Sequence, residues 1–142
     1  MSADDDEELP FPGDDFGCFG CSRANPDGMG LRFRRRGDSI WGRYTIPERY
    51  RGFPGVAHGG IVSLILDEYS CAAPAYLRGT TVLTGELTVR FERPCPVEEE
   101  IEISARVTDD SHPRFLVIAA EIRRAGELVA RSTGRFFPFS PR

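Results

Sequence analysis

The chain has 142 residues with 22 acidic and 18 basic side chains, which gives a net charge of −4. Its length suits one domain with a hydrophobic core and is too short for two ordinary domains. Five of the acids lie together at residues 4–8, and the remaining 17 acids balance the 18 bases, so nothing in the charge favours nucleic acid as a partner.

No apolar run approaches the roughly 20 residues that cross a bilayer. The acidic N-terminus is also unlike a secretory signal, which begins with basic and then apolar residues. We therefore expect a cytoplasmic protein that does not contact a membrane. Residues 1–16 combine acids with Pro10, Pro12 and Gly13, a composition typical of a disordered, solvated tail, so the folded domain is expected at residues 17–142.

Cys18 and Cys21 follow the tail and are the only cysteines close together in the sequence. A zinc site would need a second ligand pair at matching spacing, and only isolated residues, Cys71, Cys95, His58 and His112, are available for it. We expect Cys18 and Cys21 to pack the start of the fold, with no metal and no cofactor bound.

Two strands are expected before the centre of the chain. Residues 29–36 and 39–46 have apolar positions on both sides of Gly37-Asp38, a pair with turn chemistry, and this pattern predicts a hairpin. Residues 47–57 contain several glycine and proline breaks and are expected to form a loop that leads into a helix.

Residues 59–76 are apolar on nearly all sides of a helix, which predicts a buried helix. The helix opens with Gly59 and Gly60, whose backbone N–H groups no side chain covers, so they suit an oxygen that carries negative charge. Within the helix lie Asp67 and Glu68. An ionised carboxylate in a buried helix is unfavourable unless it is paired or hydrogen-bonded, and such residues often mark a functional site.

The helical repeat separates the two acids. At 100° per residue, Asp67 lies on a stripe of small and polar residues, whereas Glu68 flanks the bulky apolar face, so Asp67 is the better candidate for chemistry. The alternatives are a salt bridge or a backbone cap for Asp67, a structural or solvent role for Glu68, and a packing role for His58.

Gly59 and Asp67 are eight residues apart, which is about 12 Å along one helix. They cannot touch the same carbonyl group from one chain. If both act on one substrate, the helix start and the acid must come from different subunits around a two-fold axis, which predicts a homodimer with two shared sites.

After Gly79 the apolar pattern changes to a period of two, which predicts strands at residues 83–92, 99–108, 114–124 and 127–138. In the first of these, Leu83, Leu87, Val89 and Phe91 are expected on one face, and Thr84, Glu86, Thr88, Arg90 and Glu92 on the wet face. Short connections around one buried helix predict the α+β class, with an antiparallel sheet wrapped around the helix.

These residues resemble the hotdog-fold acyl-CoA thioesterases of the phenylacetate-pathway (PaaI-like) type. The signature His58-Gly59-Gly60 opens the helix, and Asp67 follows nine positions after the histidine. The resemblance extends over about residues 17–139, and the other matching segments are Cys18-Phe19-Gly20-Cys21, Asn25-Pro26, Gly30-Leu31, Gly52-Phe53-Pro54-Gly55 and Phe91-Glu92-Arg93-Pro94. One departure is Gly52, where some relatives have an asparagine six residues before the histidine.

The resemblance implies a hotdog fold, dimers that often pair into tetramers, and hydrolysis of an acyl-CoA to a carboxylic acid and free CoA. It gives Gly59 the role of N–H donor to the carbonyl oxygen, within the signature that includes His58 and Gly60. Asp67 of the facing subunit would act as general base on water or attack the carbonyl itself, and Thr84 would assist the water.

The same resemblance places the CoA phosphates near Arg90 and Arg93, whose forked donors suit phosphate. The alternative is that these arginines are solvated or paired with Glu86 and Glu92. Two other functions stay open: a non-catalytic acyl-CoA sensor, and a hotdog hydratase or dehydratase, although Arg51 stands where that enzyme has its catalytic histidine.

Overall fold

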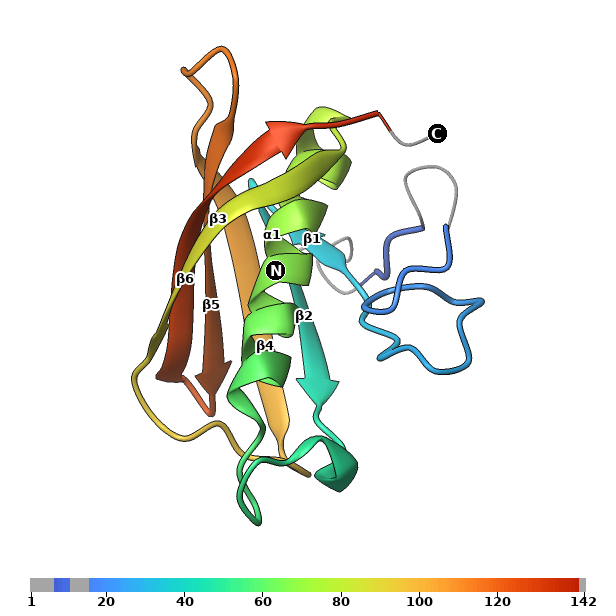
Figure 1. Ribbon diagram of the computed structural model, residues 1–142, viewed down its shortest axis with the longest axis vertical. Coiled ribbons are helices and arrows are strands. Elements are labelled where there is room, and N and C mark those ends of the chain that lie inside the picture. Colours follow the sequence, from blue (N-terminus) through green and yellow to red (C-terminus); the bar gives the residue numbers. More distant parts are fainter. Residues whose placement is uncertain (1–6, 11–15, 141–142) are drawn as a thin grey trace.

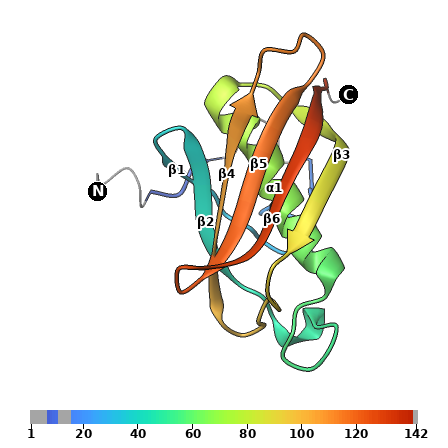
Figure 2. The same cartoon turned by 90° about the vertical axis from the view of Figure 1, so that its left-hand side faces the viewer.

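The computed structural model describes residues 7–10 and 16–140. One long helix, α1 (Gly59–Arg78), packs against a six-stranded antiparallel sheet, as Figures 1 and 2 show. This is the predicted α+β arrangement. The strands are β1 (Arg34–Arg36), β2 (Ser39–Thr45), β3 (Val82–Phe91), β4 (Glu100–Asp109), β5 (Leu116–Arg124) and β6 (Glu127–Pro138), in the spatial order β1-β2-β4-β5-β6-β3.

The helix is buried on several sides because its apolar residues recur around the whole helix. Its fully buried side chains include Ile65, Leu66 and Tyr69, which contact the apolar inner face of the sheet. α1 ends two residues later than predicted, because Gly79 adopts a left-handed conformation with φ 64° and its N–H bonds to the carbonyl of Pro74.

No helix in the described part of the chain is long and apolar enough to cross a membrane.

The predicted first hairpin is shorter than expected. β1 contains only Arg34–Arg36, although residues 29–33 were predicted to belong to it. The reason is that the preceding backbone bonds elsewhere: the N–H groups of Met29 and Leu31 donate to the carbonyls of Phe19 and Gly20. Residues 16–33, which we call the N-terminal segment, therefore pack as a loop beside α1, on the side away from β5 and β6 (Figure 1).

Most of the predicted tail, residues 1–16, lies outside the described residues. The part that is described contacts the domain. Glu8 forms ion pairs with Arg23 and Arg32 at 2.8 and 3.3 Å, and the N–H of Leu9 donates to the carbonyl of Phe33. Residues 8 and 9 are therefore held against the N-terminal segment.

The face assignment for β3 was wrong at its first residues. Thr84 pairs with Phe136 and Glu86 with Arg135, so Gly85 is an extra residue in a β-bulge, and a bulge reverses the alternation of side chains. Thr84 consequently lies on the inner face with the buried Phe136, while Leu83 lies outside and is 53% exposed.

Candidate functional site

Asp67 lies in the middle of α1 and faces β3. Its carboxylate Oδ1 accepts a hydrogen bond of 2.5 Å from the hydroxyl of Thr84. Burial raises the pKa of Asp67 above its usual value, and the hydrogen bond from Thr84 partly opposes this rise. In the described part of the chain, Oδ2 of Asp67 has no hydrogen-bond partner, so neither predicted alternative, a salt bridge or a backbone cap, occurs there.

The bulge in β3 makes the contact between Thr84 and Asp67 possible. Without the extra residue, the period of two would turn Thr84 away from α1. A Cβ atom at Gly85 would lie 2.2 Å from a ring carbon of Phe137, so a larger residue at the bulge would require the Phe137 ring to move. The sequence therefore encodes the position of the Thr84 hydroxyl through Gly85.

Cys71 lies one turn after Asp67 and completes this small polar group. Its Sγ is 3.7 Å from the Thr84 hydroxyl oxygen, and burial raises the pKa of the thiol to about 12. A neutral thiol beside Thr84 cannot act as a nucleophile at neutral pH. We therefore regard Cys71 as a neighbour of the hydroxyl rather than as a reactive group.

The first turn of α1 presents one free backbone donor. The side chain of His58 caps the helix, because its Nδ1 accepts a hydrogen bond of 2.9 Å from the N–H of Gly60. In the described part of the chain, the N–H of Gly59 has no acceptor. The donor at the positive end of the helix is thus Gly59, while His58 and Gly60 satisfy each other.

A pocket of about 310 Å³ lies beside this helix start. The ring of Phe91 borders it and would lie 3.6 Å from a Cβ atom at Gly59. The lining is mostly apolar, with Glu92 and Arg93 as its charged members, and the full set is Val56, Ala57, Val62, Phe91, Glu92, Arg93, Pro94 and Cys95. Gly59 itself does not line this pocket, but its neighbours Ala57 and Val62 do.

The structure separates the two arginines that were predicted to bind CoA phosphates. Arg93 borders the pocket at the helix start, bonds to the Leu128 carbonyl at 2.8 Å and pairs with Glu127 at 3.6 Å. Arg90 lies on the outer face of the sheet and pairs with Glu92 at 3.6 Å, one of the ion pairs foreseen as an alternative.

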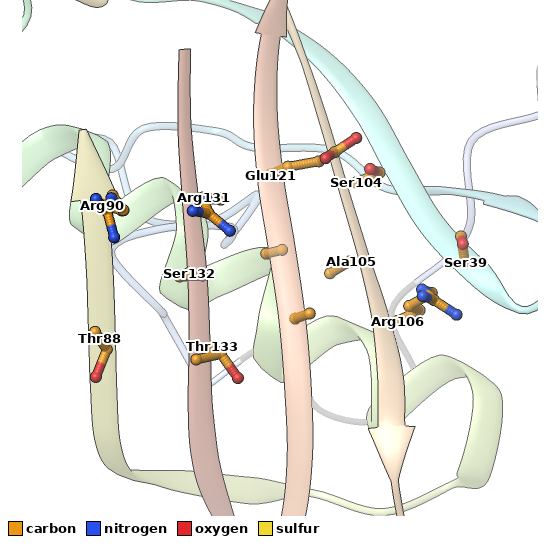
Figure 3. A pocket seen from close by; sticks show the side chains of 12 residues that line it. Ser39, Thr88, Arg90, Ser104, Ala105, Arg106, Glu121, Arg131, Ser132 and Thr133 are labelled. Carbon is orange, nitrogen blue, oxygen red and sulfur yellow. The ribbon is translucent and has the colours of Figure 1, made fainter. Parts of the chain in front are cut away.

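Figure 3 shows Arg90 in a shallow depression of about 660 Å³ on the outer face, with Arg131 and Glu121 close by. Strands β3, β6, β5 and β4 supply its floor, and α1 lies behind the sheet. Because the sheet separates this depression from Asp67, it is not part of the same site.

Glu68 points away from Asp67 and toward the N-terminal segment. The thiol of Cys18 donates to Oε1 of Glu68 at 3.2 Å, and burial raises the pKa of the carboxyl. The sequence offered no signal for this contact, because the residues are 50 positions apart. Glu68 therefore contacts the N-terminal segment. This contact agrees with the structural role that was given as the alternative to a chemical one.

Comparison with known proteins agrees with this geometry. The family model described as "Thioesterase superfamily" matches residues 54–130, which is more than half of the chain and includes α1, the helix start and β3. The chain therefore belongs to the thioesterase superfamily, as the signature at residues 58–60 predicted.

Among curated proteins, the acyl-coenzyme A thioesterase THEM4 of Bos taurus is 29% identical over 93 residues, which are 64% of this chain and 37% of that protein. The chain thus spans little more than a third of the length of this relative.

Solved structures share the fold. A thioesterase superfamily protein has a TM-score of 0.75 at 27% identity and covers 82% of this chain, which covers 60% of it. A conserved protein of Pseudomonas aeruginosa has a TM-score of 0.64 at 26% identity over 72% of this chain and 82% of that one. A phenylacetic acid degradation-related putative thioesterase of Ralstonia eutropha JMP134 has a TM-score of 0.68 at 20% identity, over 77% of this chain and 85% of its own. The fold of this chain is the predicted hotdog fold.

Proposed function

We propose that this protein is an acyl-CoA thioesterase in which Asp67 acts on the substrate carbonyl or on the attacking water. The observation that carries the proposal is the pair formed by Asp67 and Thr84. This carboxylate is half-buried in the central helix, has no cationic partner in the described part of the chain, and is held by a hydroxyl through one oxygen only. Membership of the thioesterase superfamily supports the reaction class.

The reaction needs a base or nucleophile and a donor for the developing negative charge. In the first route, Asp67 takes a proton from water, the hydroxide attacks the thioester carbon, and collapse of the intermediate expels the CoA thiolate. In the second, Asp67 attacks the carbon directly, the C–S bond breaks to expel the CoA thiolate, and water hydrolyses the resulting anhydride to the free acid and the Asp67 carboxylate. In both routes the N–H of Gly59 donates to the carbonyl oxygen.

The shared site requires a second subunit. Gly59 and Asp67 are about 12 Å apart along α1, so one carbonyl cannot contact both residues of one chain. β3 ends the sheet, and one side of its backbone has no strand partner in the described part of the chain. We propose that two copies pair along β3, which would bring the Gly59 of one subunit toward the Asp67 of the other.

The apolar pocket beside Gly59 supports an acyl group or the pantetheine arm as its occupant, with Arg93 at its border. Gly60 keeps its role within the signature by fixing the cap with His58. Arg90 faces outward, on the side of the sheet away from Asp67, so its position does not support the predicted role in phosphate binding.

The experiment that tests the proposal measures release of free thiol from a panel of aliphatic and aromatic acyl-CoA esters. Wild type and Asp67→Asn are compared at equal concentration. Turnover in the wild type and its loss in the variant would support the proposal and identify the acyl class. Binding of acyl-CoA without turnover in the wild type would overturn it in favour of a sensor.

Complementation tests whether the site is shared. Asp67→Asn and Gly59→Pro chains are unfolded, mixed in equal amounts and refolded together. If each site combines the Gly59 of one subunit with the Asp67 of the other, each mixed dimer has one intact site, and about a quarter of the wild-type activity returns. If both residues act within one chain, every site contains a substitution and no activity returns.

A single turnover in ¹⁸O-labelled water separates the two routes. Attack of water on the Asp67 carbon of the anhydride leaves one labelled oxygen on the Asp67 carboxylate, so label on Asp67 after a single turnover identifies the anhydride route. The general-base route leaves the label in the released acid alone. Mass spectrometry of the peptide that contains Asp67 reads the difference.

A further inference from the structure

The second acid of α1 lies in a cluster that the thioesterase chemistry does not use. Cys18, Cys21 and Glu68 are all half-buried, and their ligand atoms, two Sγ and one carboxylate oxygen, lie within 4.8 Å of one another. They come from two segments that are far apart in the sequence. The fold has therefore brought together three groups of the kind that bind transition metals.

The backbone at Gly20 lies very close to the side chain of Glu68. A Cβ atom at Gly20 would lie 2.3 Å from Cδ and 2.6 Å from Oε1 of Glu68, so the loop between the two cysteines approaches the carboxylate as only glycine allows. Three backbone bonds fix this loop, from the N–H groups of Ser22, Met29 and Leu31 to the carbonyls of Cys18, Phe19 and Gly20. The backbone that carries the two cysteines is thus held in place before any ion binds.

In the described part of the chain, no cation balances this half-buried acid. The side chains that influence the carboxyl of Glu68 are Cys18, Cys21 and Asp67, and all three are neutral or negative. A buried carboxylate among thiols is unfavourable without a positive charge, whereas thiolates together with a carboxylate are a favourable environment for a divalent ion of borderline softness.

We propose that Cys18, Cys21 and Glu68 bind a Zn²⁺ ion that fastens the N-terminal segment to α1. Zinc prefers four ligands at about 2.0 Å for oxygen and about 2.3 Å for sulfur, which sets neighbouring ligand atoms roughly 3.5 Å apart. Side-chain shifts of about 1 Å would bring the three atoms to that spacing. Water completes the tetrahedron, and the two thiols release their protons to solvent when the ion binds.

The sequence argued against zinc because no second ligand pair follows Cys18 and Cys21 at zinc-finger spacing. The third ligand is a glutamate from the central helix, which spacing rules for cysteine and histidine do not cover. The proposed site is also independent of hydrolysis, because Glu68 and Thr84 lie on different sides of Asp67 and the zinc content can be measured without substrate.

The test is the zinc content of the whole chain, produced with zinc in the medium and purified without chelator. Elemental analysis should find about one zinc per chain in the wild type and less than about 0.2 in Cys21→Ser and Glu68→Gln. Glu68→Gln preserves the volume of the side chain, so it keeps the test informative if the cysteine variant does not fold. Cys95→Ser is the matched control and should retain its zinc, because Cys95 is buried beside the helix start instead.

Cobalt substitution gives a second measurement. Co²⁺ added to the reduced, metal-free chain should produce a thiolate-to-cobalt charge-transfer band in the wild type and in Cys95→Ser, and the band should be absent in Cys18→Ser. The proposal is overturned if the reduced wild type takes up neither ion. It is equally overturned if Glu68→Gln and Cys21→Ser bind zinc as fully as the wild type does.

Discussion

Two adjacent carboxylates on one helix have opposite surroundings. Asp67 faces the edge strand β3 and touches a hydroxyl, with one oxygen free in the described part of the chain, whereas Glu68 is covered by the N-terminal segment and touches thiols. Burial raises the pKa of both. The difference teaches that a shifted pKa does not identify a catalytic acid. What distinguishes Asp67 is its partner, a hydroxyl on the edge strand β3, whereas Glu68 bonds to a thiol of the N-terminal segment.

The largest expected effect is the difference in activity between a variant of Asp67 and a variant of Glu68. Asp67→Asn removes the base or nucleophile with almost no change in volume and should lower kcat by about 10²–10⁴-fold. Glu68→Gln leaves the pair of Asp67 and Thr84 intact and should lower kcat/KM by less than about tenfold. Steady-state thiol release measures both. Equal losses in the two variants would break the distinction between a reacting acid and a structural one.

The next effect concerns the start of the same helix. Gly59→Pro removes the free N–H donor and should lower kcat by about a hundredfold, or about 3 kcal/mol of transition-state stabilisation. Proline is tolerated at the first helical position, and His58 already has the extended conformation that a following proline requires, with φ −59° and ψ 136°.

The matched control for that variant is Gly59→Ala. It keeps the N–H, and its methyl group would lie at an ordinary 3.6 Å from the ring of Phe91. Its loss of kcat should be much smaller than that of the proline variant. If alanine and proline reduce kcat alike while circular dichroism shows a folded chain, crowding by the side chain explains the loss and the donor role is refuted.

Much of this architecture was predictable because it follows from local periodicity. The helix and its acids, the turn at Gly37-Asp38 and the strands after Gly79 all appear as patterns of apolar residues with glycine punctuation. The bulge at Gly85 was not predictable in this way, because one extra residue leaves the composition of a strand unchanged while it reverses every later face.

The surroundings of the two acids were predictable only in part. The helical repeat predicted different faces for Asp67 and Glu68, and the two acids have different partners in the structure, while the choice of Asp67 for chemistry stays a prediction. The partners of each acid come from distant segments: Thr84 through the bulge, and Cys18 through a loop that packs against α1. Sequence spacing contains no information on such contacts. The close approach of Gly20 to Glu68 was therefore not predicted, although Gly20 lies in a segment that matches the family.

A smaller loss of activity is expected when the hydrogen bond from Thr84 to Asp67 is removed. Thr84→Val keeps the shape of the side chain but removes the hydroxyl that donates to Oδ1, and should lower kcat by about tenfold, since the hydrogen bond to a charged group is worth about 1.5–3 kcal/mol and water replaces part of it. Thr84→Ser keeps the hydroxyl and should recover most of the activity. A serine variant as slow as the valine variant would show that packing at β3, rather than the hydrogen bond, matters.

The smallest effect on turnover should come from a substitution beside Glu68. That substitution should instead lower the stability of the fold. Gly20→Ala would place its methyl group 2.3 Å from Cδ of Glu68 and should lower the free energy of unfolding by about 1–3 kcal/mol. Gly52→Ala, whose nearest neighbour would be 3.4 Å away, is the matched control and should change stability much less. In a Glu68→Ala background the methyl group at residue 20 has room, so the loss should largely disappear in a double-mutant cycle of denaturant unfolding. A loss that persists there would mean that Gly20 is required by the loop itself and not by its approach to the carboxylate.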